Sequence, residues 1–133
     1  MSADPVKRPA VAEFVRLLFH RQPDRGMQLI EFESRCVRRG EIHEIVTADQ
    51  PGLGPGDRAD RIGFLGFAEF EVGGVLERGD QVLLDRQPLG TVLGFDECHF
   101  PNHYNVIVQC AEIASAMEAR VRVGSVLHFE AAG

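Results

Sequence analysis

The densest group of chemically active side chains in this sequence lies in the segment GFDECHFPNHYN, residues 94–105. Its centre holds two carboxylates, a thiol, two imidazoles and a carboxamide, contributed by Asp96, Glu97, Cys98, His99, Asn102 and His103. No other window of the chain concentrates polar functional groups in this way. Since connections between rigid strands commonly carry the working residues of a β scaffold, this segment is the candidate site.

Metal binding is one chemistry that fits these residue types. His99 and His103 are four residues apart, a spacing that converges on one ion when the backbone is helical. Pro101 lies between them and disfavours the helical conformation of the residue before it, so a helical metal motif is not expected. A loop can still gather ligands around a divalent first-row metal ion. The candidate ligands are His99, His103 and His43, with Glu97 or Cys98 completing the set.

Acid–base chemistry without a metal fits the same segment. Imidazole titrates near neutrality, and a neighbouring carboxylate fixes its tautomer and tunes its pKa. We expect His99 and His103 to be the catalytic residues, oriented by the carboxylates of Asp96 and Glu97. Amide and phenol groups supply hydrogen-bond donors to a developing oxyanion or to a bound ligand. The residues expected to contact a ligand are Asn102, Tyr104, Cys98 and His43.

Two further interpretations of the segment stay open. Cys98 is a candidate nucleophile, and His103 is its better base because adjacent residues such as His99 usually point away from each other. Alternatively, the polar groups only hydrogen-bond the backbone of their own turn, which Pro101 stiffens. The three cysteines of the chain match no zinc framework, so we expect reduced thiols rather than disulfides.

Composition narrows the class of protein. A chain of 133 residues, 44% of them hydrophobic and 26% charged, is typical of a single globular domain spanning 1–133. A net charge of -6 argues against sequence-independent binding to nucleic acid, because such binding needs clustered Lys and Arg. No apolar run is long enough to span a bilayer, and the first residues lack the apolar core of a signal peptide. We therefore expect a cytoplasmic protein that binds neither nucleic acid nor membrane.

The first element that must support the segment is predicted to be a helix over 5–22. Its apolar residues recur at i, i+3, i+4, i+7 and i+8, which places them on one helical stripe. The residues of this stripe are Val11, Phe14, Val15, Leu18 and Phe19. Turn-forming residues at 23–26 then end the helix.

From residue 27 onward the apolar pattern changes to a period of two, which is typical of half-buried strands. A strand beginning at Met27 and a turn at 38–40 predict a hairpin with a strand over 41–47. Residues 48–60 are rich in Gly and Pro and predict a long surface loop. Further strands are predicted over 62–72, 81–84, 89–95, 104–110 and 120–129. Short strands at this spacing indicate a mainly β fold, a small and mostly antiparallel barrel over 27–130 with the 48–60 loop near its mouth.

Part of this strand region resembles a known family. The stretch 62–108 carries IGFLGFAEFE and then LGTVLGFD, and it resembles the glucitol/sorbitol-specific IIA component of the bacterial sugar phosphotransferase system. The resemblance implies a small β barrel and a phosphohistidine carrier, although it assigns the phosphorylated histidine to no particular residue here. The segment GFDECHFPNHYN in turn resembles the signature of a small, uncharacterised bacterial family.

The sequence thus predicts a bacterial, cytoplasmic enzyme or binding protein that acts on a small molecule. Its working group is a cluster of histidines and carboxylates on a loop at the barrel rim, with a divalent metal ion as an open question. A phosphohistidine carrier and a non-enzymatic module that binds a protein partner are the alternatives. Exposed strand edges leave pairing of identical copies open as well.

Overall fold

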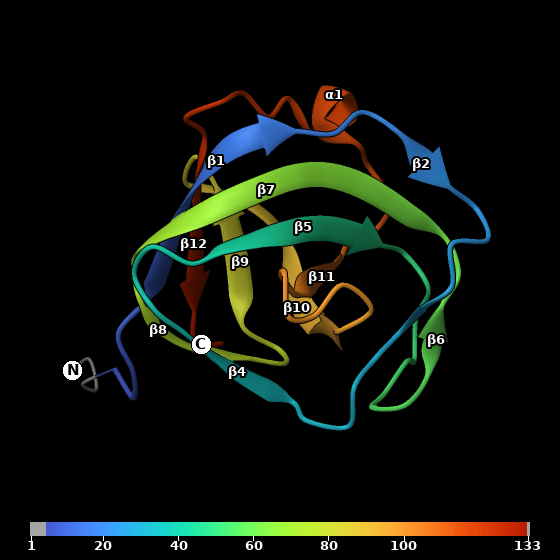
Figure 1. The fold of residues 1–133 in the computed structure, drawn as a ribbon, viewed down its shortest axis with the longest axis horizontal. Helices are drawn as coiled ribbons and strands as arrows, with labels where there is room; N and C mark the ends of the chain where they lie inside the picture. The colour runs from blue at the N-terminus through green and yellow to red at the C-terminus, as the bar shows by residue number, and fades with distance from the viewer. Residues whose placement is uncertain (1–4, 133) are drawn as a thin grey trace.

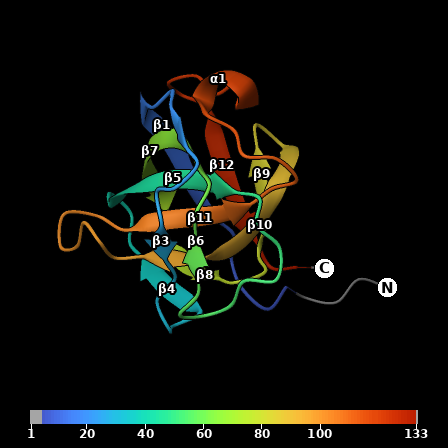
Figure 2. The same ribbon diagram turned by 90° about the vertical axis from the view of Figure 1, so that its right-hand side faces the viewer.

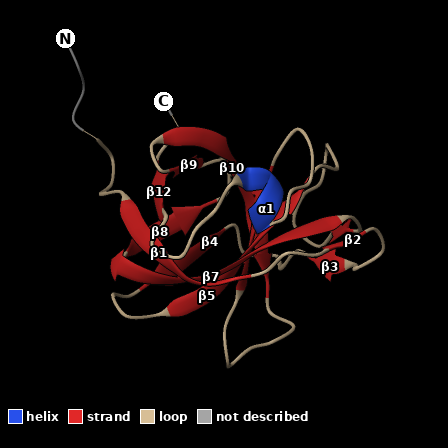
Figure 3. Cartoon of the chain, turned by 90° about the horizontal axis from the view of Figure 1, so that it is seen from above, coloured by secondary structure: helices blue, strands red, loops and turns tan. Residues whose placement is uncertain are grey.

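The computed structural model describes residues 5–132, which form a mainly β structure with one short helix (Figure 1). The strands are β1 (Ala10–Leu17), β2 (Arg21–Gln22), β3 (Met27–Gln28), β4 (Ser34–Val37), β5 (Ile42–Ala48), β6 (Arg58–Ala59), β7 (Ile62–Val72), β8 (Gly74–Glu77), β9 (Gln81–Leu84), β10 (Gln87–Asp96), β11 (Asn105–Gln109) and β12 (Val126–Glu130). The helix is α1 (Ala116–Ala119), the blue segment in Figure 3. No helix in the described part of the chain has the length and apolar character needed to cross a membrane.

Seven of the strands close into a ring. Their order is β1, β12, β9, β10, β11, β5 and β7, and β7 pairs back onto β1. Every pairing in the ring is antiparallel except that between β5 and β11, which is parallel. The strand β2 adds to the outer edge of β7, while β3 with β6 and β4 with β8 form two small ribbons. The ring provides the rigid frame from which the loops project.

The predicted N-terminal helix over 5–22 is wrong, because this stretch contains β1 and β2. Alternate residues of β1 are buried, with Ala10, Ala12 and Phe14 at most 1% exposed. Val15 and Phe19, which the helical stripe would bury, are 39% and 59% exposed. The strand hydrogen-bonds to β12 on one side and to β7 on the other, with a bulge after Phe14. These non-local pairings outweigh an apolar spacing that a helix and a bulged strand share.

The predicted hairpin around residues 38–40 is also wrong. The chain has only the short strands β3 and β4 between residues 27 and 37, and β4 pairs with β8 rather than with β5. The strand β5 instead lies between β11 and β7. Six successive residues of β5, from His43 to Ala48, are buried. A strand buried on both faces belongs in the middle of a sheet, and a two-stranded hairpin would leave it exposed.

Other strand predictions are confirmed. The bounds of β7 and β9 are the predicted 62–72 and 81–84, and β10 and β11 match their predictions closely. The last strand starts later than predicted, at Val126, because a turn and α1 precede it. Residues 49–61 contain only the two-residue strand β6. Local alternation of apolar residues is therefore sufficient to find β7, β9, β10 and β11, although not β1.

Two apolar clusters lie on opposite faces of β5, β7 and β11. One fills the inside of the ring and includes Phe14, Phe70, Phe95 and Phe129. The other lies on the outer face, where β3, β6 and their loops cover Val46, Ile62, Phe64 and Ile107. The three strands are therefore fixed from both sides. They form the most rigid support available to a site at their ends.

The hairpin of β10 and β11 carries the segment singled out above. Its loop, residues 97–104, extends beyond the ends of the paired strands and is orange in Figure 2. The register places Asp96 opposite Asn105, Asn105 beside Glu44 of β5, and Glu44 opposite Phe67 of β7. This row across four strands forms the floor below the loop.

Candidate metal centre

A single turn inside loop 97–104 brings the two histidines together. The backbone N–H groups of Asn102 and His103 both donate to the carbonyl oxygen of His99, at 2.9 and 3.4 Å. The second of these bonds spans four residues, as in one turn of an α-helix. The imidazole rings of His99 and His103 consequently stack with their centroids 5.1 Å apart. A single turn thus brings the two imidazoles together, although Pro101 disfavours a longer helix here.

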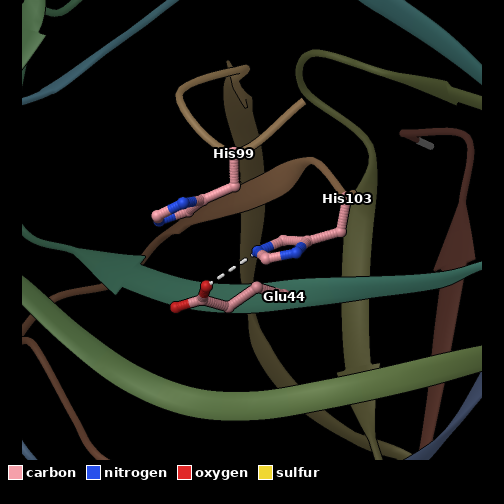
Figure 4. Close-up of side chains that lie close together, drawn as sticks. All are labelled: Glu44, His99 and His103. Carbon is pink, nitrogen blue, oxygen red and sulfur yellow. Dashed lines mark hydrogen bonds and ion pairs between the residues drawn. The ribbon is translucent and has the colours of Figure 1, made fainter. Parts of the chain in front are cut away.

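The strand β5 supplies a carboxylate to this pair. The backbone N–H of Glu44 donates to the carbonyl oxygen of Tyr104 at 3.0 Å, which ties the loop to the start of β5. The Glu44 Oε1 atom lies 3.1 Å from Nε2 of His103, and both side chains are only 8% exposed. Figure 4 shows the three side chains converging, with His99 from the loop above Glu44. One ligand atom each from Glu44, His99 and His103 lie within 4.8 Å of one another.

The orientation and the proton position of His103 follow from its neighbours. The Asn102 Nδ2 atom lies 2.8 Å from Nδ1 of the imidazole, so Nδ1 accepts a hydrogen bond and carries no proton. The proton therefore sits on Nε2 and points to Glu44. Phe67 contacts the ring edge-on, with centroids 5.0 Å apart and an interplanar angle of 84°. Three neighbours hold the imidazole in place, whereas His99 is exposed.

His43 stays outside the cluster that we expected it to join. Its Nδ1 atom accepts the backbone N–H of Tyr104 at 3.0 Å, and its Nε2 atom donates to Glu41 at 2.7 Å. The ring stacks on Tyr104 with centroids 4.7 Å apart. Burial lowers the pKa of His43, and the Glu41 carboxylate opposes this effect only in part. His43 is thus a neutral group with both nitrogens engaged, and it anchors the loop to β5.

The two carboxylates expected to orient the histidines make other contacts. Asp96 accepts the backbone N–H groups of Gln28 and Cys98, both at 2.9 Å, and the Nδ2 group of Asn105 at 3.1 Å. Glu97 pairs with Arg35 at 2.8 Å. The carboxylate that contacts an imidazole of the loop is that of Glu44.

Cys98 likewise lies with a different set of partners. Its Sγ atom is 3.3 Å from the guanidinium of Arg25 and 3.5 Å from Nδ2 of Asn105. Burial and the Asp96 carboxylate raise the pKa of the Cys98 thiol, against the opposing charge of Arg25. Among residues 5–132 no hydrogen bond links this thiol to either histidine of the loop. A thiol with a raised pKa and no adjacent base is a poor nucleophile.

Loop 97–104 separates two clefts. One has a volume of about 210 Å³ and lies between the loop and the start of β5, with Asn102, His103 and Tyr104 in its wall. The other has a volume of about 570 Å³ and lies between the loop and residues 28–32, with Asp96, Glu97 and Cys98 in its wall. His103 therefore belongs both to the convergent cluster and to the smaller cleft.

The residue that sequence reasoning missed is Glu44. Its only signal in the sequence is its place next to His43 in a strand of alternating pattern. Its position beside His103 depends on the parallel pairing of β5 with β11, two strands that are far apart in the chain. Nothing local in the sequence reveals that pairing.

Comparison with known protein families matches residues 4–130 to DUF6917, a family of unknown function. No curated protein and no solved structure matches the chain. The likeness of residues 62–108 to the glucitol/sorbitol-specific IIA component is not among these findings and stays a prediction. The expectation of an uncharacterised family is confirmed. Because the match covers nearly the whole chain, this protein belongs to the DUF6917 family.

Proposed function

We propose that the protein binds one divalent first-row transition metal ion through Glu44, His99 and His103 and uses it in a reaction on a small molecule. The observation that carries this proposal is the convergence of the three donor atoms within 4.8 Å. In a tetrahedral site with ligand bonds of about 2.1 Å, neighbouring donor atoms lie about 3.4 Å apart. The proposed site requires the exposed His99 side chain to move closer to the other two donors.

The charge of Glu44 supports the same proposal. This side chain is 8% exposed, and in the described part of the chain its carboxylate has a hydrogen bond from His103 and no pairing with Lys or Arg. A buried carboxylate is costly unless a cation or several hydrogen bonds compensate it. A divalent cation between Glu44 and the two imidazoles supplies that compensation.

Asn102 provides the adjustment that His103 needs in order to act as a ligand. Coordination through Nε2 requires the other neutral tautomer of His103, in which its single ring proton sits on Nδ1 instead of on Nε2. The exposed amide of Asn102 then turns so that its oxygen, instead of its NH₂ group, faces Nδ1. An imidazole ligand that donates its second N–H to a fixed acceptor is the usual arrangement in metal sites.

The type and number of ligands favour a reactive site over a structural one. Structural zinc sites are usually closed by four protein ligands, whereas two histidines and one carboxylate leave coordination positions open. A metal ion in such a site polarises a substrate oxygen and lowers the pKa of a bound water molecule. One of the three proposed ligands, His103, also lines the smaller cleft, so part of a bound molecule in that cleft would lie next to the metal ion.

Zinc titration of the purified, chelator-treated protein tests the proposal. We expect one zinc ion per chain by calorimetry, and we expect the affinity of His99→Ala to fall by more than about 100-fold, since even loss of an outer partner costs 10- to 100-fold. His99 is exposed, so its replacement leaves the fold intact. His20→Ala, at an exposed histidine of another loop, is the matched control and should bind zinc as the wild type does. Equal zinc affinities of the wild type and His99→Ala would rule the site out.

A further inference from the structure

The smaller cleft has a wall of unusual chemistry. Aromatic rings from the loop and from β5 line it together with one carboxylate, and the residues that matter for its chemistry are Glu41, His43, Phe100, Tyr104 and His103. Phe100 stacks on Tyr104 with centroids 5.5 Å apart and yet is 57% exposed. The cleft therefore offers aromatic surface that the fold itself does not cover.

The carboxylate of Glu41 has hydrogen-bond donors but no basic side chain paired with it apart from His43 in the described part of the chain. Its Oε1 atom accepts Nε2–H of His43 at 2.7 Å, and its Oε2 atom accepts the backbone N–H of Arg38 at 2.6 Å. His43 is neutral in this arrangement, because its Nδ1 atom accepts the backbone N–H of Tyr104. In the part of the chain that the structure describes, no Lys or Arg side chain pairs with Glu41. A fixed, partly exposed carboxylate thus stands at the wall of an aromatic cleft.

An aromatic ring and a carboxylate together bind a cation elsewhere in this protein. The guanidinium of Arg35 lies over the ring of Tyr104, 3.5 Å from its centroid, and pairs with the carboxylate of Glu97 at 2.8 Å. An aromatic face and a carboxylate together hold this internal cation. The cleft repeats the combination with the exposed ring of Phe100 and the carboxylate of Glu41, and no Lys or Arg among the described residues lines it.

We infer that this cleft binds the cationic head of a small organic molecule, a guanidinium or an alkylammonium group, between the aromatic rings and Glu41. Its volume of about 210 Å³ is below the usual range of pockets that enclose a whole ligand, so it fits a head group rather than a complete drug-sized molecule. His103 lines the cleft and is also one of the three proposed metal ligands. If the proposed function holds, the remainder of the same molecule reaches the metal ion, and the substrate class is a small amine or guanidine compound.

A built-in reporter makes the cleft accessible to experiment. The chain contains one tyrosine, Tyr104, and no tryptophan, so its intrinsic fluorescence reports on this wall alone. The probe is ethylguanidinium chloride, added to the full chain in the presence of a metal chelator and at constant ionic strength. Ethylurea, which has a similar shape and no charge, and propionate, which is an anion, are the matched control ligands.

We expect ethylguanidinium to change the Tyr104 emission in a saturable way, and we expect ethylurea and propionate to leave it unchanged. Glu41→Gln should weaken binding by about fivefold or more. The variant removes the pairing of the bound cation with a partly exposed carboxylate, and such a pairing contributes on the order of 1 kcal/mol. Phe100→Ala, at an exposed position, should weaken it as well and guards against a folding defect in Glu41→Gln. Glu112→Gln, at an exposed carboxylate elsewhere, should have no effect.

An equal response to ethylurea, or no saturable response to ethylguanidinium, would overturn this inference. The titration is made without metal, so its outcome does not depend on the zinc site. Zinc binding together with a silent Tyr104 would leave the proposed function in place and remove the cationic substrate. Ethylguanidinium binding by a protein that fails to bind zinc would keep the cation-binding cleft and remove the proposed metal site.

Discussion

Residues 96–98 form the first half of the polar segment and residues 99–103 the second, and the two halves have opposite surroundings. In the first half, the carboxylate of Asp96 has three donors, Glu97 has Arg35, and the thiol of Cys98 lies against Arg25. In the second half, His99 is exposed and His103 faces a buried carboxylate that no basic side chain of the described residues compensates. Polar groups that are already satisfied stabilise a loop, whereas those that are not are available to a ligand. The density of polar residue types alone does not separate these two cases.

The largest expected effect is on zinc affinity, and it distinguishes the carboxylate of Glu44, beside His103, from that of Glu97, which pairs with Arg35. Glu44→Gln should lower zinc affinity by more than about 100-fold, because it removes a ligand together with the charge that the metal balances. Glu97→Gln should leave zinc affinity within about twofold, since its partner is Arg35 at the loop surface. Competition with a chromophoric chelator measures both. Similar losses in the two variants would show that the halves of the segment do not differ in the way described here.

An intermediate effect concerns the stability of the first half. Asp96 is 4% exposed and accepts two backbone N–H groups and one side-chain amide. Asp96→Ala should lower the free energy of unfolding by about 1–3 kcal/mol, the usual cost of leaving buried donors without an acceptor. Urea denaturation measures this change, and Asp24→Ala, at an exposed turn position, is the control. Loss of zinc binding without loss of stability in Asp96→Ala would instead assign this residue to the site.

The smallest expected effect concerns the pH dependence of the anchor at His43. Burial lowers the pKa of this imidazole below 6.5 in the folded state, with the charge of Arg35 adding to the effect and Glu41 opposing it. The unfolded chain therefore binds a proton near pH 6.5 that the folded chain does not take up. The contribution of His43 to stability is thus present above pH 6.5 and is lost as the pH falls toward the lowered pKa.

Urea denaturation of the metal-free protein at about pH 7.5 and about pH 5.5 tests this sign. The wild type should lose more stability between the two conditions than His43→Gln does, since the variant has no proton to take up at this position. His20→Gln, at an exposed histidine, should follow the wild type. An equal decline in wild type and His43→Gln would place the pH sensitivity at another group.

The strand predictions are right where the local apolar pattern has one interpretation, and they are wrong where contacts between distant strands decide the structure. The alternation in residues 62–72 and 81–84 is a local property of the chain, and it identified β7 and β9 with their bounds. The apolar spacing of residues 11–19 is equally local but ambiguous, since a bulged strand and a helix both accommodate it. Pairing with β7 and β12 decides in favour of the strand.

At Gly66 the backbone has a φ of 147°, and a Cβ atom there would collide with the carbonyl oxygen of Arg16. So close an approach of β1 to β7 is a matter of packing, which no spacing of apolar residues indicates.

The sequence by itself determined that this chain is mainly β and that its densest group of polar functional side chains lies between residues 96 and 103. Only the tertiary structure decided which of those residues converge, and it added Glu44 in place of Asp96, Glu97 and His43. The physical reason is the pairing of β5 with β11, two strands far apart in the sequence, which places Glu44 beside Asn105 at the base of the loop. Such a pairing depends on the burial of the whole chain, so the residues at its ends become neighbours only in the folded protein.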